Sequence, residues 1–266
     1  MDLPHTYSLT PGTALVSAYG GRRGVVVAEI AGRDSVAAVI AAAIDSGRAI
    51  HTVVPTAVFT GTEYGDPAAP HHAVDHIARL LPDVEFAPLT WVGDPRMWAA
   101  LNGRFASVIA GRYGLFSPCL ACHLYVHLCR IPLALALGNA PVIAGERETH
   151  DGKIKYSQTA TSIDICIEIL ASVGIELLQP LRVANGVEVA SYIGDDWAAG
   201  PDPLECVLSG NYRDLDGSVG LDEDAYRAYA EEFLRPVGLA LATALAKDVS
   251  APDYLAIVRN VLGGGE

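Results

Sequence analysis

The stretch Val25-Val-Val-Ala-Glu-Ile-Ala-Gly-Arg-Asp-Ser35 decides the fold, because it joins an apolar strand to a helix through a short loop. Val25 to Ala28 form an uninterrupted apolar run, which is typical of a strand buried on both faces of a parallel sheet. The apolar run 36–44 follows as a helix, whose first N–H groups point into the loop and favour an anion there. Asp34 and Ser35 are also good N-cap residues, so simple helix initiation is an equal alternative.

Outward from this unit, strands and helices alternate along the chain. Apolar runs predict further strands at 50–59, 84–89, 141–144 and 175–182. Amphipathic or apolar segments predict helices at 71–81, 95–110, 124–137, 162–171 and 188–193. This alternation predicts an α/β fold with a doubly wound, mostly parallel, Rossmann-like sheet. We expect one nucleotide-binding and cluster domain over 1–215 and a small C-terminal helical extension over 216–266.

Composition and charge narrow the class of protein. Of the 266 residues, 51% are hydrophobic and 18% are charged, which is enough for a packed core. The net charge is −13 with only 18 Lys and Arg, which argues against a protein that grips nucleic acid phosphates and favours a small-molecule substrate. Met1–Tyr7 has no signal-peptide pattern, and no run of 18 apolar residues predicts a membrane span. We therefore expect a cytoplasmic protein.

The five cysteines are expected to be thiols or metal ligands, because an odd number in a reducing compartment does not suit a disulfide framework. Cys119 and Cys122 form a Cys-x-x-Cys pair that can chelate a metal or cluster. We place the third ligand at Cys206, with Cys129 as the main rival because it lies two helical turns after Cys122.

The sequence Cys119-Leu-Ala-Cys122-His123 is also compatible with three other functions. A zinc ion could take His123 or His127 as its fourth ligand. Cys-x-x-Cys-His is also the attachment motif of c-type haem, which belongs outside the cytoplasm, and a redox dithiol is less favoured still. His72 and His76 lie four residues apart, but no further ligand lies beside them, so they are interpreted as an exposed helix face.

A second group of ionisable residues follows the predicted strand 141–144. The carboxyl end of a strand in an open α/β sheet is where ligands bind, so we favour a functional loop over a solvated one. Its candidate catalytic residues are Glu148, His150, Asp151, Lys153 and Lys155.

The order of these motifs resembles the PP-loop ATP pyrophosphatase superfamily, which is adenine nucleotide alpha-hydrolase-like. Ile30-Ala-Gly-Arg-Asp-Ser35 stands where that superfamily usually has Ser-Gly-Gly-x-Asp-Ser, and it departs from the pattern at Ile30 and Ala31. The segment 145–151 only partly matches the usual Gly-His-Asn-x-Asp-Asp. The paired zinc-knuckle cysteines of the tRNA-modifying members are absent from the sequence.

Within the superfamily, the cysteines resemble the iron–sulfur branch of thiolation enzymes. Cys119 and Cys122 match its Cys-x-x-Cys, Glu205-Cys206 matches the neighbourhood of its third cysteine, and Gln179-Pro-Leu-Arg182 matches the stretch that precedes it. The resemblance implies that Cys119, Cys122 and Cys206 hold a [4Fe-4S] cluster with one iron left open.

The resemblance also implies an ATP site with Mg²⁺. The expected nucleotide-binding residues are Ala31, Gly32, Arg33, Asp34, Ser35 and Gly145. Asp34 would place Mg²⁺ or the pyrophosphate end, Lys153 or Lys155 would neutralise phosphate, and Asp151, His150 or Glu148 would move protons.

The expected function is sulfur transfer on a small molecule, in which a carbonyl oxygen is adenylated and then replaced by sulfur from a sulfide donor. One alternative is an ATP-independent desulfidase that removes sulfur from a thiolated base or thioamide. The other is a zinc-stabilised nucleotide-binding protein without turnover. A homodimer is allowed, since the sequence carries no signal of oligomeric state.

Overall fold

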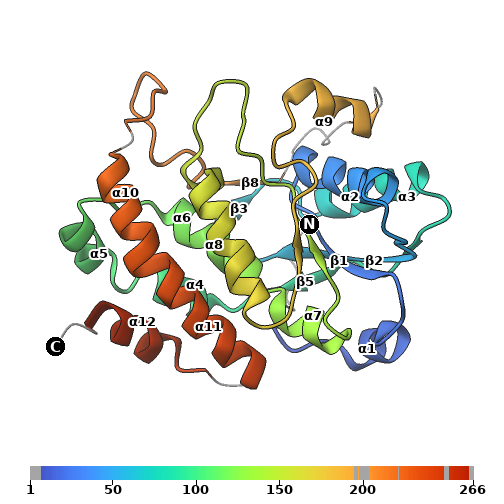
Figure 1. The fold of residues 1–266 in the computed structure, drawn as a ribbon, viewed down its shortest axis with the longest axis horizontal. Helices are drawn as coiled ribbons and strands as arrows, with labels where there is room; N and C mark the ends of the chain where they lie inside the picture. The colour runs from blue at the N-terminus through green and yellow to red at the C-terminus, as the bar shows by residue number, and fades with distance from the viewer. Residues whose placement is uncertain (1–6, 195–196, 198–203, 221, 249–251, 264–266) are drawn as a thin grey trace.

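The computed structural model describes residues 7–194, 197, 204–220, 222–248 and 252–263. Residues 1–6 of the N-terminal segment considered above lie outside these ranges. The central sheet runs in the order β4-β2-β1-β6-β7, and β5 also pairs with β2 (Figure 1). Its strands are β1 (Val25–Glu29), β2 (Thr52–Val58), β4 (Glu85–Phe86), β5 (Thr90–Val92), β6 (Val142–Ile143) and β7 (Leu177–Leu178). Each pairing in this sheet is parallel, which confirms the predicted fold class.

Strand β1 lies at the centre of the sheet and buries side chains on both faces. Val25 and Val27 belong to one hydrophobic core, whereas Val26 and Ala28 belong to the other. Successive side chains of a strand point to opposite faces, so a continuous apolar run is required wherever both faces are covered. The Val25 to Ala28 run therefore specifies a strand with a layer of helices on each side.

The two helical layers have different sizes. The smaller core includes residues of α2 (Arg33–Asp45), α3 (Ala69–Leu80) and α9 (Gly186–Ile193). The larger core includes residues of α4 (Pro95–Asn102), α5 (Ala106–Tyr113), α6 (Pro118–Leu128), α7 (Ile131–Ala136) and α8 (Ala160–Ala171). Helix α1 (Thr13–Tyr19) precedes β1. The result is a doubly wound sheet with helices packed on both of its faces.

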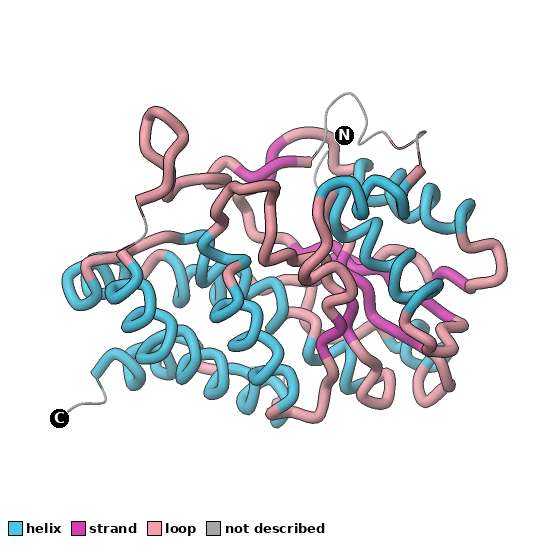
Figure 2. The backbone as a smooth tube through the Cα atoms, turned by 45° about the horizontal axis from the view of Figure 1, so that its top comes forward, coloured by secondary structure: helices cyan, strands magenta, loops and turns pink. Residues whose placement is uncertain are grey.

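The C-terminal helices complete the larger core. They are α10 (Glu223–Tyr229), which continues as a π-helical turn over Ala230–Leu234, then α11 (Arg235–Lys247) and α12 (Tyr254–Gly263). Helix α11 packs against α6, α7 and α8, and Tyr229, Phe233 and Leu241 are fully buried. Figure 2 shows these helices grouped beside the sheet. The predicted extension 216–266 thus shares its core with the residues before 215.

Several elements differ from the sequence prediction, among them α1, which lies where no helix was expected. The helix expected over 95–110 is divided into α4 and α5, because Gly103 ends α4 with its N–H bonded to the Ala99 carbonyl. The helix expected over 124–137 begins earlier, at Pro118, and is divided between α6 and α7 near Pro132. A two-stranded antiparallel ribbon, β3 (Glu63–Tyr64) with β8 (Glu205–Cys206), was not predicted.

The stretch Pro118–Ala136 is long and apolar enough to cross a membrane by composition, but 67% of its apolar window is buried inside the protein. It comprises α6 and α7, and it includes Arg130, whose side chain is 1% exposed. The stretch is therefore a core element of this fold.

Candidate functional site

A cavity of about 540 Å³ lies where β1, β6 and the start of α6 meet the β3–β8 ribbon. Small-molecule sites commonly occupy about 300–1,000 Å³, so the cavity can hold a ligand of nucleotide size. Its walls come from segments far apart in the sequence. It is lined by Glu29, 31–35, Thr60, Glu63, Pro118, Cys119, Cys122, His123, Val126, Gly145, Glu146, Lys155, Gln158, Cys206, Leu208 and Ser209.

The β1–α2 loop forms one wall, and Ser35 holds it closed. The Ser35 Oγ accepts hydrogen bonds from the backbone N–H groups of Ala31 and Gly32, both at 2.9 Å, and donates to the Gly32 carbonyl at 2.7 Å. The hydroxyl therefore stabilises the loop in this conformation. Helix α2 starts at Arg33, and the positive end of its dipole lies at the cavity wall.

Gly145 allows the end of β6 to lie directly against this loop. A Cβ atom at Gly145 would lie 2.5 Å from the Ser35 backbone nitrogen and 2.6 Å from the Asp34 carbonyl carbon. Both are backbone atoms that a rotamer change cannot move. Only glycine fits at this position, because the strand end and the helix start approach so closely.

Asp34 is held by a buried cation. Arg147 Nε lies 3.0 Å from Asp34 Oδ2, and the Arg147 side chain is 7% exposed. Lys155 also lines the cavity, and burial lowers its pKa against the opposing effect of Asp34. Asp34 is therefore committed to an ion pair with Arg147, which differs from its expected role as a Mg²⁺ ligand.

Four of the candidate catalytic residues do not line the cavity: Glu148, His150, Asp151 and Lys153. Glu148 forms an ion pair with Arg182, and Asp151 accepts a hydrogen bond from the Gly186 N–H. Lys153 is exposed. The charged loop folds back onto the segment before α9, which satisfies these polar groups there.

His150 is buried near the cavity but does not line it. Burial, together with the nearby cations Lys155 and Arg147, lowers the pKa of His150 to about 4. The imidazole is therefore neutral at pH 7. Of the expected proton-moving and phosphate-neutralising residues, only Lys155 lines the cavity. Asp34, which was expected to place Mg²⁺ or the pyrophosphate end, lines it too.

The three cysteines chosen from the sequence line the same cavity. Cys119 and Cys122 lie on the first turns of α6, and Cys206 is brought to them by the pairing of β8 with β3. Burial raises the pKa of Cys119 and raises that of Cys122 to about 12, and the neighbouring thiols add to both shifts. Such thiols become thiolates only where a cation compensates the charge, which is how metal ligands behave.

Each of these sulfur atoms also has a polar neighbour. Trp98 Nε1 donates to Cys122 Sγ at 3.4 Å, Cys119 Sγ donates to the Leu208 carbonyl at 3.3 Å, and Cys206 Sγ lies 3.1 Å from Thr62 Oγ1. The other two thiols, Cys129 and Cys166, are buried in the larger core and do not line the cavity. Cys129 is therefore not placed to be the third ligand.

The spacing of the three thiols bears on the choice between zinc and a cluster. Tetrahedral zinc with bonds of about 2.3 Å to sulfur brings its thiolates to within about 4 Å of one another. Within the described ranges, one group of His, Cys, Asp or Glu has all its ligand atoms within 4.8 Å of one another, and the three thiols are not that group. At least one pair of ligand atoms among the three thiols is therefore more than 4.8 Å apart.

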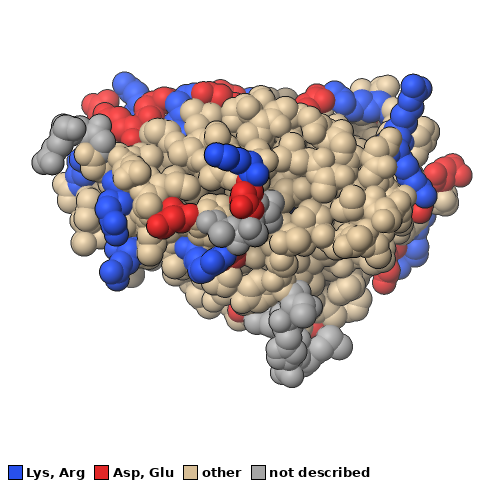
Figure 3. All heavy atoms as spheres, turned by 90° about the horizontal axis from the view of Figure 1, so that it is seen from below, with Lys and Arg blue, Asp and Glu red and all other residues tan. Residues whose placement is uncertain are grey.

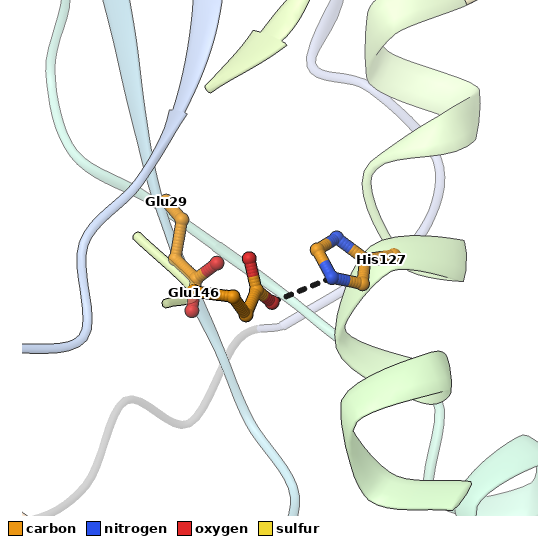
Figure 4. A group of neighbouring side chains, drawn as sticks. All are labelled: Glu29, His127 and Glu146. Carbon is orange, nitrogen blue, oxygen red and sulfur yellow. Dashed lines mark hydrogen bonds and ion pairs between the residues drawn. The ribbon is translucent and has the colours of Figure 1, made fainter. Parts of the chain in front are cut away.

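The group that meets this criterion is Glu29, His127 and Glu146, called the carboxylate–histidine trio below (Figure 4). Glu29 ends β1, His127 lies on α6, and Glu146 follows β6. His127 Nε2 lies 2.7 Å from Glu146 Oε1, and Gln179 Nε2 donates to Glu146 Oε2 at 2.7 Å. Burial disfavours the charged form of both groups, but the attraction between them is stronger than this effect. The Glu146 carboxylate therefore raises the pKa of His127, and His127 lowers the pKa of Glu146 well below its usual range.

Sequence reasoning missed this trio. It named His127 only as an alternative zinc ligand and read Glu146 as part of a charged loop. One signal was present, since Glu29 and Glu146 are the first charged residues after two apolar strands of one parallel sheet, and such strands end at the same edge.

Comparison with known proteins gives one relative. No protein-family model matches the chain, and no solved structure matches it. The chain is 35% identical over 245 residues to the uncharacterized protein MJ0009 of Methanocaldococcus jannaschii, and the match covers 90% of this chain and 87% of that protein. Identity at this level over almost the whole of both chains shows that the chain belongs to the same family as MJ0009.

Proposed function

We propose that the protein is an iron–sulfur-dependent enzyme of sulfur transfer on a small molecule. One observation carries the proposal: three thiols from two distant segments line the same cavity as the N-terminus of α2 and Lys155. A thiol cluster alone would fit a structural metal, and a helix N-terminus alone would fit ordinary capping. Their meeting in one cavity of about 540 Å³ supports an enzyme that uses both.

In the proposed reaction, a carbonyl oxygen of the substrate attacks the α-phosphorus of ATP and pyrophosphate leaves. A sulfide donor then attacks the carbon of the adenylated carbonyl group. The C–O bond breaks, so AMP departs with the oxygen and a thiocarbonyl remains. No electrons are exchanged. The N–H groups at the start of α2 and the Lys155 ammonium would bind the phosphates, because both present positive charge to the cavity.

Cys119, Cys122 and Cys206 would hold a [4Fe-4S] cluster. Thiolates are the ligands that such clusters prefer, and a set of three leaves one iron free for an external sulfur. The three thiols line one cavity, which supports a shared group held by all of them.

A second candidate is desulfidation without ATP, and the β1–α2 loop favours it. The N–H groups of Ala31 and Gly32 are bonded to the Ser35 Oγ, and Asp34 is paired with Arg147. These groups would have to be released before they could bind phosphate or Mg²⁺. A desulfidase would need no such rearrangement.

The proposed partners are a small-molecule substrate and a sulfide donor. On the face shown in Figure 3, Lys and Arg side chains are scattered and do not form a stripe that would follow a nucleic acid backbone. A cluster with an open iron is best preserved in a reducing compartment, which supports a cytoplasmic location.

Anaerobic purification tests the proposal. We expect a brown protein with broad visible absorption and with iron and acid-labile sulfide in equal amounts. The Cys206→Ala variant should lose both, whereas the matched Cys166→Ala variant, which removes a core thiol outside the cavity, should keep them. A colourless protein with stoichiometric zinc would refute the proposal.

The direction of transfer needs a separate assay. Release of AMP and pyrophosphate that requires both a carbonyl acceptor and sulfide would support thiolation. Sulfide release from a thiolated heterocycle in the absence of ATP would support desulfidation.

A further inference from the structure

The carboxylate–histidine trio has no role in the sulfur-transfer proposal, yet two of its members, Glu29 and Glu146, line the same cavity. We propose that Glu29, His127 and Glu146 form a second metal site, which takes one first-row divalent cation such as Mn²⁺, separately from the three thiols. The ligand atoms of the trio lie within 4.8 Å of one another, from three elements that meet at the sheet edge (Figure 4). This proposal does not depend on the presence of a cluster.

Charge and burial support the site. Glu146 and His127 are 4% and 1% exposed, and the Glu29 side chain is 12% exposed. Two carboxylates this close repel each other strongly away from water unless a cation lies near both. The Arg130 guanidinium is 3.9 Å from Glu29 Oε2, which is too far for a hydrogen bond. Arg130 supplies a counter-charge to Glu29 and His127 pairs with Glu146, but Glu29 Oε2 has no hydrogen-bond donor in the described part of the chain.

One buried carboxylate oxygen of the trio has no hydrogen-bond partner: among the described residues, the buried side-chain atoms without one include Glu29 Oε2. His127 Nδ1 also has no partner among these residues, but it points away from Nε2, the ring nitrogen that faces Glu146. A buried carboxylate oxygen without a partner is costly, and a metal ion bound to it removes that cost. The other carboxylate is already oriented, since Gln179 donates to Glu146 Oε2 while Oε1 faces His127 Nε2. Such supporting hydrogen bonds are typical around metal ligands.

A cation has a route to the trio. Glu29 and Glu146 line the cavity that the β1–α2 loop also lines, and Glu29 lines an adjoining cavity of about 200 Å³ as well. Because Asp34 is paired with Arg147, the carboxylates that remain for a cation near the α2 N-terminus are those of the trio and Glu63. Glu63 is already bonded to Thr60 and the Gly61 N–H. The trio is therefore the best-placed cation site in this wall.

The ligand types indicate which cation. Ca²⁺ and Mg²⁺ prefer oxygen ligands alone, whereas imidazole suits Zn²⁺, Fe²⁺ and their neighbours and carboxylates suit Mn²⁺. One imidazole with two carboxylates therefore selects a first-row divalent ion over calcium or magnesium. Mn²⁺ is the useful probe because it is paramagnetic.

The test is Mn²⁺ titration of chelator-treated full-length protein, with free Mn²⁺ followed by electron paramagnetic resonance. We expect one bound Mn²⁺ per chain in the wild type and in Cys206→Ala, so that loss of the cluster leaves this site intact. Glu29→Gln should weaken binding at least tenfold, whereas the matched Glu63→Gln variant should bind as the wild type does. Absence of Mn²⁺ binding, or equal binding by Glu29→Gln, would overturn the proposal.

Pulsed measurements on the wild-type protein test whether a histidine binds the Mn²⁺, and two variants identify which histidine it is. Wild-type protein carrying ¹⁵N-labelled histidine should show nitrogen coupling to bound Mn²⁺. That coupling should persist in His123→Gln, whose imidazole lies 3.7 Å from Glu146, and should disappear in His127→Gln. Mn²⁺ without nitrogen coupling, or coupling lost only in His123→Gln, would refute the assignment.

Discussion

Replacement of Gly145 by alanine tests how the cavity wall is built. The added Cβ would meet three backbone atoms of the β1–α2 loop at 2.5–2.7 Å, and none of them is the end of a flexible side chain. The strand end or the first turn of α2 must therefore move. Overpacking of this kind costs about 2 kcal/mol. For a chain of this size, that loss corresponds to a melting temperature lower by roughly 4–8 °C.

The matched control is Gly111→Ala in α5, where a Cβ would have no neighbour within 4 Å. Alanine is the better helix former by about 0.5–1 kcal/mol, so this variant should be slightly more stable than the wild type. The assay is thermal unfolding followed by far-ultraviolet circular dichroism, with stabilisation by added ATP as a second readout. Gly145→Ala should melt lower and lose any stabilisation by ATP. A Gly145→Ala protein that melts at or above the wild type would refute the close-packing argument.

Two further predictions follow from single side chains. Tyr125→Phe should lower the free energy of unfolding by about 1–3 kcal/mol, because the Tyr125 hydroxyl donates to the Phe59 carbonyl and accepts from the Asp94 N–H. The control is Tyr192→Phe, whose hydroxyl makes an exposed hydrogen bond to Asp45, and it should change the free energy of unfolding by less than about 0.5 kcal/mol. Equal effects of the two variants in urea unfolding would contradict this. His150 should titrate near pH 4 by NMR. Because the same histidine in the unfolded state is protonated at a higher pH, the free energy of unfolding should fall as the pH drops from about 6.5 to about 4, and it should fall less in His150→Gln. A His150 titration near pH 6.5 would disprove this.

The parts of the fold that the sequence predicted are those with strong local signals. The apolar run from Val25 to Ala28 predicts a strand covered on both faces. The apolar, alanine-rich segment after Ser35 predicts the helix that follows it. The division of 95–110 at Gly103 had a local signal too, since glycine is common where a helix ends. The β3–β8 ribbon had none, because two strands of two residues each carry no periodicity.

The residues of the candidate site also fall into two groups, those with a local sequence signal and those that only the tertiary structure brings together. Cys119 and Cys122 are close together in sequence, whereas Cys206 is far from them and its choice over Cys129 was supported by the resemblance to a family. Glu148, Asp151 and Lys153 looked catalytic because they are dense in the sequence, but local density does not say where a loop folds. The trio was missed because its members come from β1, α6 and the end of β6, and only the tertiary structure brings them together.

The β3–β8 ribbon can unfold locally while the central sheet stays folded. The amides of β1 lie at the centre of the sheet between β2 and β6, so they exchange with solvent only when the whole domain unfolds. Cys206 instead belongs to a two-stranded ribbon outside that sheet. Opening of the ribbon frees one thiol and leaves every hydrogen bond of the central sheet in place. Under the sulfur-transfer proposal, this local opening would release and recapture the Cys206 ligand and let the cluster enter a domain that is already folded.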